Sequence, residues 1–295
     1  MFSLRSIVAD LPRRLEVYDI GARIEGEPRY ASLIQHWPAS VTAFEPQKSE
    51  LDQLESLGPH VRVLPYALGD GSTATFHVTR WPGNCSLFEP DPSVIDCFCG
   101  IGAAAIDANF HVVRTENVRT FRLDDLEGLP SPDCIKLDIQ GAELSVLSNG
   151  RRQLSHALVV ESEVLFVPLY RDQPLFGEMQ SFMREAGFLF HRFLDMQGRC
   201  WRPFAATQPV AVSQPLWADA IFVRDPTRIA LWTDEDLLVG AVILHEMYRS
   251  FDLVLKLLSD YDRRRGTAHS SLYLAKVREE SSIQQVLPAF RLPAT

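Results

Sequence analysis

The sequence predicts an α/β fold in which a doubly wound, mostly parallel sheet is followed by a C-terminal helical segment. Two observations lead to this prediction. Over the first 230 residues, short apolar runs typical of buried strands alternate with stretches of helical periodicity. Beyond residue 230 the periodicity is helical alone. We therefore expect a sheet domain at 1–230 and a helical extension at 231–295.

The first half of the sheet domain follows a β-α-β-α-β order, which is typical of a parallel sheet with helices on both faces. Short apolar runs closed by glycine or proline indicate the strands. Apolar residues at helical spacing, or a serine at the N-cap position, indicate the helices. The predicted strands cover 16–21, 41–45 and 61–64, and the predicted helices cover 28–36 and 49–57.

The segment after the third strand predicts a hairpin arm and then a long loop. Residues 73–78 alternate between polar and apolar side chains, which is typical of a half-buried strand. Residues 81–109 are rich in proline, glycine, asparagine and cysteine. Loops of this length inside a compact domain are usually lids or binding loops. We therefore expect residues 81–109 to contact the substrate.

The second half of the sheet domain predicts five further strands and two helices. The predicted strands cover 118–122, 135–139, 157–163, 188–194 and 219–223, and the predicted helices cover 142–149 and 175–186. In the C-terminal segment, Asp234 begins a helical pattern that continues to Leu258, residues 263–266 interrupt it, and a weaker helix is expected over 271–286. Two such helices bury little by themselves, so we expect them to pack on the sheet domain or to form a homodimer contact.

Composition narrows the class of protein. The net charge of −9 argues against a general nucleic-acid binder and favours a small or neutral partner. No stretch approaches eighteen consecutive apolar residues, so no membrane span is expected. The first ten residues lack the apolar core of a signal peptide, and the five cysteines are irregularly spaced. We interpret these features as those of a cytoplasmic protein with reduced thiols.

The run Cys134-Ile-Lys-Leu-Asp-Ile-Gln-Gly-Ala-Glu143 is the most informative part of the chain. It predicts a buried strand that ends in a carboxylate, Asp138, and breaks at Gly141. Ligands of open α/β sheets bind outside the carboxyl ends of the strands, so Asp138 is placed for chemistry. The alternative is that Asp138 merely caps the helix that follows.

The first two strands end in a pattern that suits a nucleoside ligand. Gly21 would let the backbone approach a ligand, and Glu45, 26 residues after Asp19, could accept hydrogen bonds from ribose hydroxyls. Arg23 stands where a dinucleotide fingerprint has its second glycine, which disfavours NAD. A ligand with ribose but no pyrophosphate, such as S-adenosylmethionine, fits better.

An ordered set of stretches resembles a known family, the FkbM-type family of class I S-adenosylmethionine-dependent methyltransferases. The matching stretches are Asp19-Ile-Gly-Ala22, Ala43-Phe-Glu-Pro46, Ala67-Leu-Gly-Asp70, Cys85-Ser-Leu87, Leu123-Asp-Asp-Leu126, Ile135-Lys-Leu-Asp-Ile-Gln-Gly-Ala-Glu143 and 160–176. The resemblance implies a seven-stranded, Rossmann-like sheet and S-adenosyl-L-methionine as the cofactor.

The resemblance also implies roles for individual residues. Asp19 and Gly21 would hold the methionine moiety, Glu45 the ribose, and Asp138 would face the methyl-transfer centre. Asp70 or its neighbours would lie near the adenine. The full set expected to bind the cofactor is Asp19, Gly21, Ala22, Glu45, Pro46, Ala67, Leu68, Asp70 and Asp138. The first motif departs from the family at Arg23 and Glu25, where many members have Asn and Gly.

The expected reaction is O-methylation of a hydroxyl group on a carbohydrate or small secondary metabolite. The candidate general bases are Asp138, Glu161 and Glu163, of which the last two alternate along one strand and share a face. The alternative is that these two glutamates sit at an exposed strand end or pair with Lys136 or Arg171. No metal site is expected, although Asp138 with Glu161 or Glu163 could hold a hard cation.

Two competing functions remain open. A binding or scaffolding protein would keep the sheet but would have lost the cofactor through Arg23 and Glu25. A nicotinamide-dependent dehydrogenase is disfavoured by the missing glycine. Binding of S-adenosylmethionine or of NAD distinguishes these three hypotheses.

Overall fold

The computed structural model describes residues 2–24, 26–204 and 213–280. The chain divides into two compact units: the first comprises 1–15, 26–39 and 227–295, and the second comprises 16–25 and 40–226. The first unit therefore adds two N-terminal segments to the helical extension. The boundary between residues 230 and 231 stays a prediction about where the folding domains divide.

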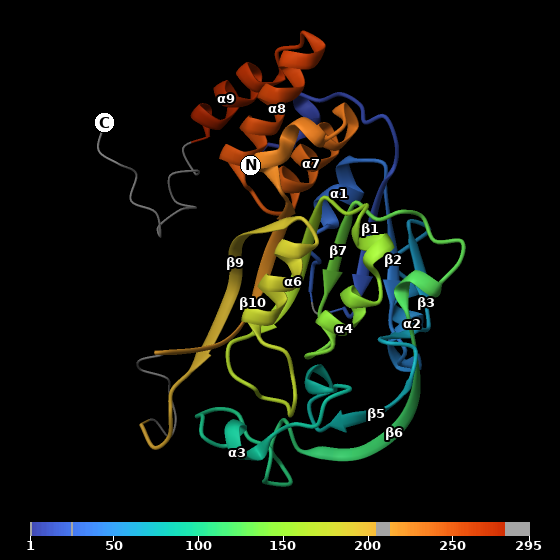
Figure 1. Cartoon of the computed structure of the whole chain (residues 1–295), viewed down its shortest axis with the longest axis vertical. Helices are drawn as coiled ribbons and strands as arrows, with labels where there is room; N and C mark the ends of the chain where they lie inside the picture. The colour runs from blue at the N-terminus through green and yellow to red at the C-terminus, as the bar shows by residue number, and fades with distance from the viewer. Residues whose placement is uncertain (1, 25, 205–212, 281–295) are drawn as a thin grey trace. The chain divides into compact units, whose positions relative to one another are not determined.

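The second unit is built on the predicted seven-stranded sheet (Figure 1). Its strands are β1 (Leu15–Ile20), β2 (Ala39–Phe44), β3 (Val61–Leu64), β7 (Cys134–Leu137), β8 (Val159–Leu165), β9 (Phe188–Arg199) and β10 (Gln214–Arg224). They lie in the order β3-β2-β1-β7-β8-β10-β9. The pairs β2–β3, β1–β7 and β7–β8 are parallel, whereas β10 is antiparallel to both β8 and β9. The chain thus reverses its direction of winding between β1 and β7, where ligands of such sheets bind.

Helices cover both faces of this sheet. They are α2 (Lys48–Glu55), α4 (Glu143–Ser148), α5 (Arg151–Leu154) and α6 (Phe176–Glu185). Ala43 and Phe44 are neighbours in β2 and therefore point to opposite faces. Leu54 of α2 packs with Ala43, whereas Val146 of α4 and Met183 of α6 belong to the core cluster of Phe44. The prediction of a doubly wound, mostly parallel sheet is confirmed.

A three-stranded sheet follows the third strand. It consists of β4 (Ala67–Leu68), β5 (Thr73–Thr79) and β6 (Val112–Phe121), in the order β4-β6-β5. β5 pairs antiparallel with β6, which confirms the predicted hairpin arm at 73–78. The strand predicted at 118–122 is longer than expected, because β6 begins at Val112.

Residues 81–109 form the predicted long excursion between β5 and β6. The regular structure in it is short: a 3-10 turn, η2 (Pro82–Asn84), and the single-turn helix α3 (Pro92–Ile95). Its apolar side chains, including Ile95 and Phe98, pack with Leu165 and Tyr170 at and beyond the end of β8. The excursion is therefore anchored at the edge of the sheet where the parallel strands end.

The first unit is helical. Its elements are η1 (Leu4–Ser6), α1 (Ala31–His36), η4 (Pro226–Leu231), α7 (Asp234–Glu246), α8 (Phe251–Arg265) and α9 (His269–Glu279). Glu246 at the end of α7 accepts hydrogen bonds from the Ser3 hydroxyl (2.6 Å), the Ser32 hydroxyl (2.6 Å) and the Trp37 indole (3.1 Å). One buried carboxylate thus joins three segments that are distant in sequence. None of the described helices is long and apolar enough to cross a bilayer.

The C-terminal helices correct two predictions. The helix expected from Asp234 to Leu258 is broken into α7 and α8, because Arg249 adopts a left-handed backbone (φ 54°). The interruption expected at 263–266 is wrong, since α8 continues to Arg265 and ends where Gly266 is left-handed (φ 68°). The helix expected over 271–286 is α9, and residues 281–286 lie outside the described part of the chain.

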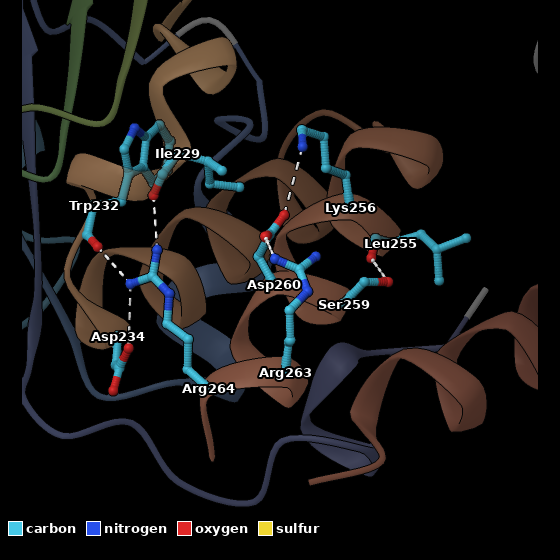
Figure 2. Close-up of polar contacts among 9 residues, drawn as sticks. All are labelled: Ile229, Trp232, Asp234, Leu255, Lys256, Ser259, Asp260, Arg263 and Arg264. Atoms are coloured by element: carbon cyan, nitrogen blue, oxygen red, sulfur yellow. Dashed lines mark hydrogen bonds and ion pairs between the residues drawn. The ribbon is translucent and has the colours of Figure 1, made fainter. Parts of the chain in front are cut away.

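The last turn of α8 is held by arginine contacts within the same unit (Figure 2). The Arg264 guanidinium donates to the carbonyl oxygens of Trp232 (2.7 Å) and Ile229 (2.8 Å). The exposed Arg263 pairs with the buried Asp260 of the same helix at 2.5 Å. The consecutive arginines therefore have different roles: Arg264 joins α8 to the segment before α7, whereas Arg263 makes an ion pair within α8.

Candidate active site at the carboxyl ends of the strands

The ends of β1, β2 and β7 converge on Gly21. The Gly21 N–H donates to the Phe44 carbonyl oxygen (2.9 Å), and the Asp138 N–H donates to the Ile20 carbonyl oxygen (3.0 Å). Gly21 has a φ of 78°, and a Cβ atom there would overlap the carbonyl oxygen of Asp138. Only glycine fits this position, because the close approach is between the two strand ends themselves.

The loop after β1 continues from this glycine. Ala22 is buried, and its N–H also donates to the Phe44 carbonyl oxygen (3.2 Å). The charge of Arg23 acts on Glu45, and its guanidinium lies 3.6 Å from where a Cβ atom of Gly83 would be. Arg23 is therefore directed toward the predicted ribose-binding acid and the excursion. Glu25 lies outside the described residues.

Glu45 follows β2 and is buried, with the exposed Pro46 beside it. Its carboxylate accepts a hydrogen bond from the Gln47 N–H (2.7 Å). Burial raises the pKa of Glu45 to about 7, although the hydrogen bond from Gln47 and the Arg23 charge oppose this rise. Glu45 thus changes charge near neutral pH, at the place predicted for a ribose.

The residues predicted near the adenine lie on β4 and in the turn after it. Leu68 is buried and Ala67 is half-buried, whereas Asp70 is exposed. The Asp70 carboxylate accepts from the Ser72 hydroxyl (2.6 Å) and N–H (2.8 Å), and these bonds lower its pKa. Asp70 therefore stabilises its own turn, and its contact with an adenine stays a prediction.

A row of charged side chains crosses the sheet on the face opposite the main core. Asp19 of β1 is the register partner of Lys136 on β7, which in turn is the partner of Glu161 on β8. The Lys136 ammonium lies 3.0 Å from the Asp19 carboxylate. Burial alone would lower the pKa of Lys136, but the carboxylates of Asp19, Asp138 and Glu161 outweigh it and raise this pKa. Lys136 therefore remains charged and balances part of the acidic row.

A second acidic row lies one step closer to the strand ends. Asp138 is exposed just after β7, and Glu163 of β8 is the register partner of Asp219 on β10. Burial raises the pKa of Glu163 well above its ordinary value, and the charges of Asp138, Glu143 and Asp219 raise it further. Arg171, the other predicted partner, instead pairs with Glu89 at 3.6 Å. Glu163 is thus a carboxyl group that holds a proton more readily than a free glutamate.

Gln140 connects Asp138 to Glu163, and sequence reasoning missed it. Its amide nitrogen donates to Asp138 Oδ1 (3.0 Å) and to Glu163 Oε2 (2.7 Å). Its amide oxygen accepts from the Tyr170 hydroxyl (3.0 Å). These contacts depend on a left-handed backbone at Gln140 (φ 57°), a conformation that the residue types in this run do not predict.

Glu143, the first residue of α4, closes the same loop. Its buried carboxylate accepts from the N–H groups of Ile139 (2.8 Å) and Gly141 (2.9 Å). Burial raises its pKa to about 7, against the opposing effect of these hydrogen bonds. The alternative that Asp138 caps the helix is wrong: Ala142 is the N-cap, and within the described residues no side chain caps it.

The described residues contain no group of three or more His, Cys, Asp or Glu side chains arranged to hold a metal ion. A pocket of about 590 Å³ is lined by residues such as Asp124, Arg152 and His156. These residues precede β7 and β8, so the pocket lies at the opposite edge of the parallel strands. The chemistry-bearing side chains therefore gather away from it, at the carboxyl ends.

Comparison with known proteins identifies a family. Residues 19–190 match the family described as methyltransferase FkbM domain. No curated protein was found to match the chain.

Several solved structures are similar over about three quarters of the chain. One is the magnesium protoporphyrin IX methyltransferase of Synechocystis PCC 6803 with bound SAM, at 11% identity, covering 75% of this chain and 76% of that chain, with a TM-score of 0.37. Another is a TehB-like SAM-dependent methyltransferase from Corynebacterium glutamicum, at 12% identity, covering 75% and 86%, with a TM-score of 0.34. A third is a SAM-dependent methyltransferase from Aquifex aeolicus, at 13% identity, covering 75% and 90%, with a TM-score of 0.33.

Proposed function

Because the chain belongs to the FkbM methyltransferase domain family, we propose that it transfers the methyl group of S-adenosylmethionine to a hydroxyl group of a carbohydrate or small metabolite. The family match covers more than half of the 295 residues and includes Asp19, Glu45, Asp138 and Glu163. The resemblance to class I S-adenosylmethionine-dependent methyltransferases, and the Rossmann-like sheet predicted with it, are thereby confirmed.

The residues at the ends of β1 and β2 fit this cofactor. Glu45 offers carboxylate oxygens to ribose hydroxyls, and Asp19 lies beside Gly21, where the strand ends approach most closely. Within the charged row, the Lys136 ammonium balances the negative charge of Asp19. The acids in this region outnumber that lysine, which favours a ligand with ammonium and sulfonium groups.

The chemistry requires a proton acceptor beside the acceptor hydroxyl. Bound S-adenosylmethionine supplies an electrophilic methyl group. Asp138 and Glu163 lie at the ends of adjacent strands, joined by Gln140, and one of them takes the hydroxyl proton as the oxygen gains the methyl carbon. This acidic pair at the carboxyl ends is the observation that most directly supports the proposal. Glu161, one step further back and facing Lys136, maintains the charge balance instead.

The excursion at 81–109 is the proposed source of acceptor specificity. The Ser86 hydroxyl donates to the Gln140 carbonyl oxygen (2.6 Å), and the Tyr170 hydroxyl lies 3.1 Å from the Asn84 carbonyl oxygen. The excursion therefore contacts the loop that bears Asp138 and Gln140. Families change substrates most readily by altering such loops on a rigid scaffold.

Transfer of a tritiated methyl group from S-adenosylmethionine to a panel of matched alcohols, amines and carboxylic acids tests this function. We expect label on hydroxyl acceptors and a loss of at least about 100-fold in Asp138→Asn or Glu163→Gln, the usual contribution of a general base. The control Glu178→Gln, on the exposed side of α6, should retain the rate. Label on amines alone would contradict O-methylation, and failure to bind S-adenosylmethionine would favour the scaffolding alternative.

A further inference from the structure

We infer that Gln140 is a positioning residue for methyl transfer: its amide joins Asp138 and Glu163 into one unit and fixes how both carboxylates face the acceptor hydroxyl. This inference rests on the proposed function, because it assigns the acidic pair to the reaction. Gln140 itself does not exchange a proton with the acceptor.

The hydrogen bonds define the orientation of the amide. Its nitrogen carries two hydrogens, which are donated one each to Asp138 Oδ1 (3.0 Å) and Glu163 Oε2 (2.7 Å). The Tyr170 hydroxyl donates to the amide oxygen (3.0 Å). The opposite orientation would direct the amide oxygen at the oxygens of two carboxylates, which repel it. Tyr170 is fully buried, so its hydroxyl is fixed in place.

The backbone of Gln140 is held in an unusual conformation. Its φ of 57° is a left-handed value that a residue with a side chain adopts only when its surroundings demand it. The Ser86 hydroxyl holds its carbonyl oxygen at 2.6 Å, and Glu143 holds the next N–H, that of Gly141. The loop thus directs the Gln140 side chain back across the ends of β7 and β8.

The surroundings of Glu163 explain why this amide matters. Asp138 after β7, Glu143 of α4 and Asp219 of β10 face it with negative charge, and Lys136 faces it with positive charge. The Tyr170 hydroxyl is also close enough for Glu163 to raise its pKa. An N–H donated to each carboxylate favours the ionised form, so it opposes the repulsion between Asp138 and Glu163. Removing the amide should therefore raise the pKa of Glu163 further.

The test measures the pKa of Glu163 directly, by carbon NMR of protein labelled at the glutamate carboxyl carbon. Glu163→Gln assigns the resonance. We expect Gln140→Met, which keeps the side-chain length, to raise this pKa by about one unit. Tyr170→Phe should raise it by less, because the amide keeps its two donors but loses its orientation. Gln180→Met, at an exposed position on α6, is the matched control and should leave the pKa unchanged.

A second measurement connects the pair to the transfer site. Sinefungin has an ammonium group where the cofactor has its methyl sulfonium, and S-adenosylhomocysteine has neither. In wild type, calorimetry should show sinefungin preferred above the pKa of Glu163, and Gln140→Met should move that preference to higher pH. A purely structural residue would weaken both ligands equally at every pH.

Two results would overturn the inference: an unchanged Glu163 pKa in a folded Gln140→Met protein, or a preference for sinefungin whose pH dependence does not move. Thermal melting of each variant shows whether it is folded, and Tyr170→Phe supplies a second readout should Gln140→Met not fold. If wild type bound neither ligand, the proposed methyltransferase function would fail, while the Glu163 titration would still show whether the Gln140 amide couples the two carboxylates.

Discussion

Gly21 illustrates how much one residue determines at this site. It accommodates the backbone of Asp138 at the point where β1, β2 and β7 end, and it does so at a φ of 78°. Gly177, the second residue of α6, differs in both respects: its φ is not left-handed, and among the described residues no atom lies within 4 Å of a Cβ built there. Alanine substitution at Gly177 is therefore a control for alanine substitution at Gly21.

Gly21→Ala should destabilise the protein by about 2–4 kcal/mol, through backbone strain and overlap with Asp138, and should abolish cofactor binding. Gly177→Ala should change the free energy of unfolding by less than about 1 kcal/mol, in the stabilising direction. Urea unfolding of both variants measures the difference. Equal stabilities would mean that the strand ends do not approach as closely as described.

At the residue scale, the sequence indicated site residues where an acidic residue lies at the end of a predicted strand. Glu45 and Asp138 follow strands, and Asp19 and Glu163 lie within the last three residues of theirs, so their shared edge of the sheet could be predicted. Gln140 could not be predicted, because its function depends on a left-handed backbone. Likewise, nothing in the sequence indicates that burial raises the pKa of Glu45 to about 7.

At the scale of elements, α8 offers a direct comparison between two neighbouring arginines (Figure 2). Arg264 is 29% exposed and donates to two backbone carbonyl groups and to Asp234 (3.3 Å). Arg263 is 71% exposed and pairs with Asp260, which Lys256 also faces at 3.5 Å. A partly buried arginine that satisfies carbonyl groups should contribute more than an exposed arginine whose partner has a second cation.

Arg264→Met should lower the free energy of unfolding by about 1–3 kcal/mol, because the carbonyl groups of Ile229 and Trp232 lose their donor. Arg263→Met should change it by less than about 1 kcal/mol, since Arg263 is exposed and Lys256 still lies 3.5 Å from the Asp260 carboxylate. Chemical denaturation followed by circular dichroism compares the two. A larger loss in Arg263→Met would reverse the assignment.

The elements of the sheet could be predicted closely, whereas the break between α7 and α8 could not. Apolar spacing continues through it, and glycine, the usual signal, is replaced by Arg249. The Arg249 N–H donates to the His245 carbonyl oxygen (3.3 Å), which is the closing bond of an αL helix terminus. Tertiary packing around α7, which is buried from Leu237 to Glu246, supports this conformation at a non-glycine residue.

At the scale of the whole molecule, alternating strands and helices were enough to predict the sheet, because right-handed crossovers leave few ways to connect parallel strands. The N-terminal part of the first unit could not be predicted. Residues 1–15 and 26–39 join the C-terminal helices through contacts such as those of Glu246, which have no local signal in the sequence. A homodimer through the C-terminal helices stays a prediction, and light scattering of the full chain tests it.

Deleting the residues beyond Thr233 should lower both the solubility and the melting temperature. The deletion removes α7, and with it the Glu246 carboxylate that binds Ser3, Ser32 and Trp37. Apolar residues of the N-terminal segments, such as Leu33, would lose their cover. A monodisperse truncated protein with an unchanged melting temperature would contradict the grouping of these segments into one unit.

Calorimetric titration with S-adenosylhomocysteine at pH 8 and pH 6, after carried-over cofactor has been removed, tests most directly whether Glu45 binds the cofactor at the end of β2. Glu45 has a raised pKa of about 7, so its carboxylate is charged at pH 8 and largely protonated at pH 6. We predict micromolar binding by wild type at pH 8 and weaker binding at pH 6. Glu45→Gln should bind about 1–3 kcal/mol more weakly at pH 8 and lose most of the pH dependence. No binding by wild type at either pH would contradict the proposed methyltransferase function.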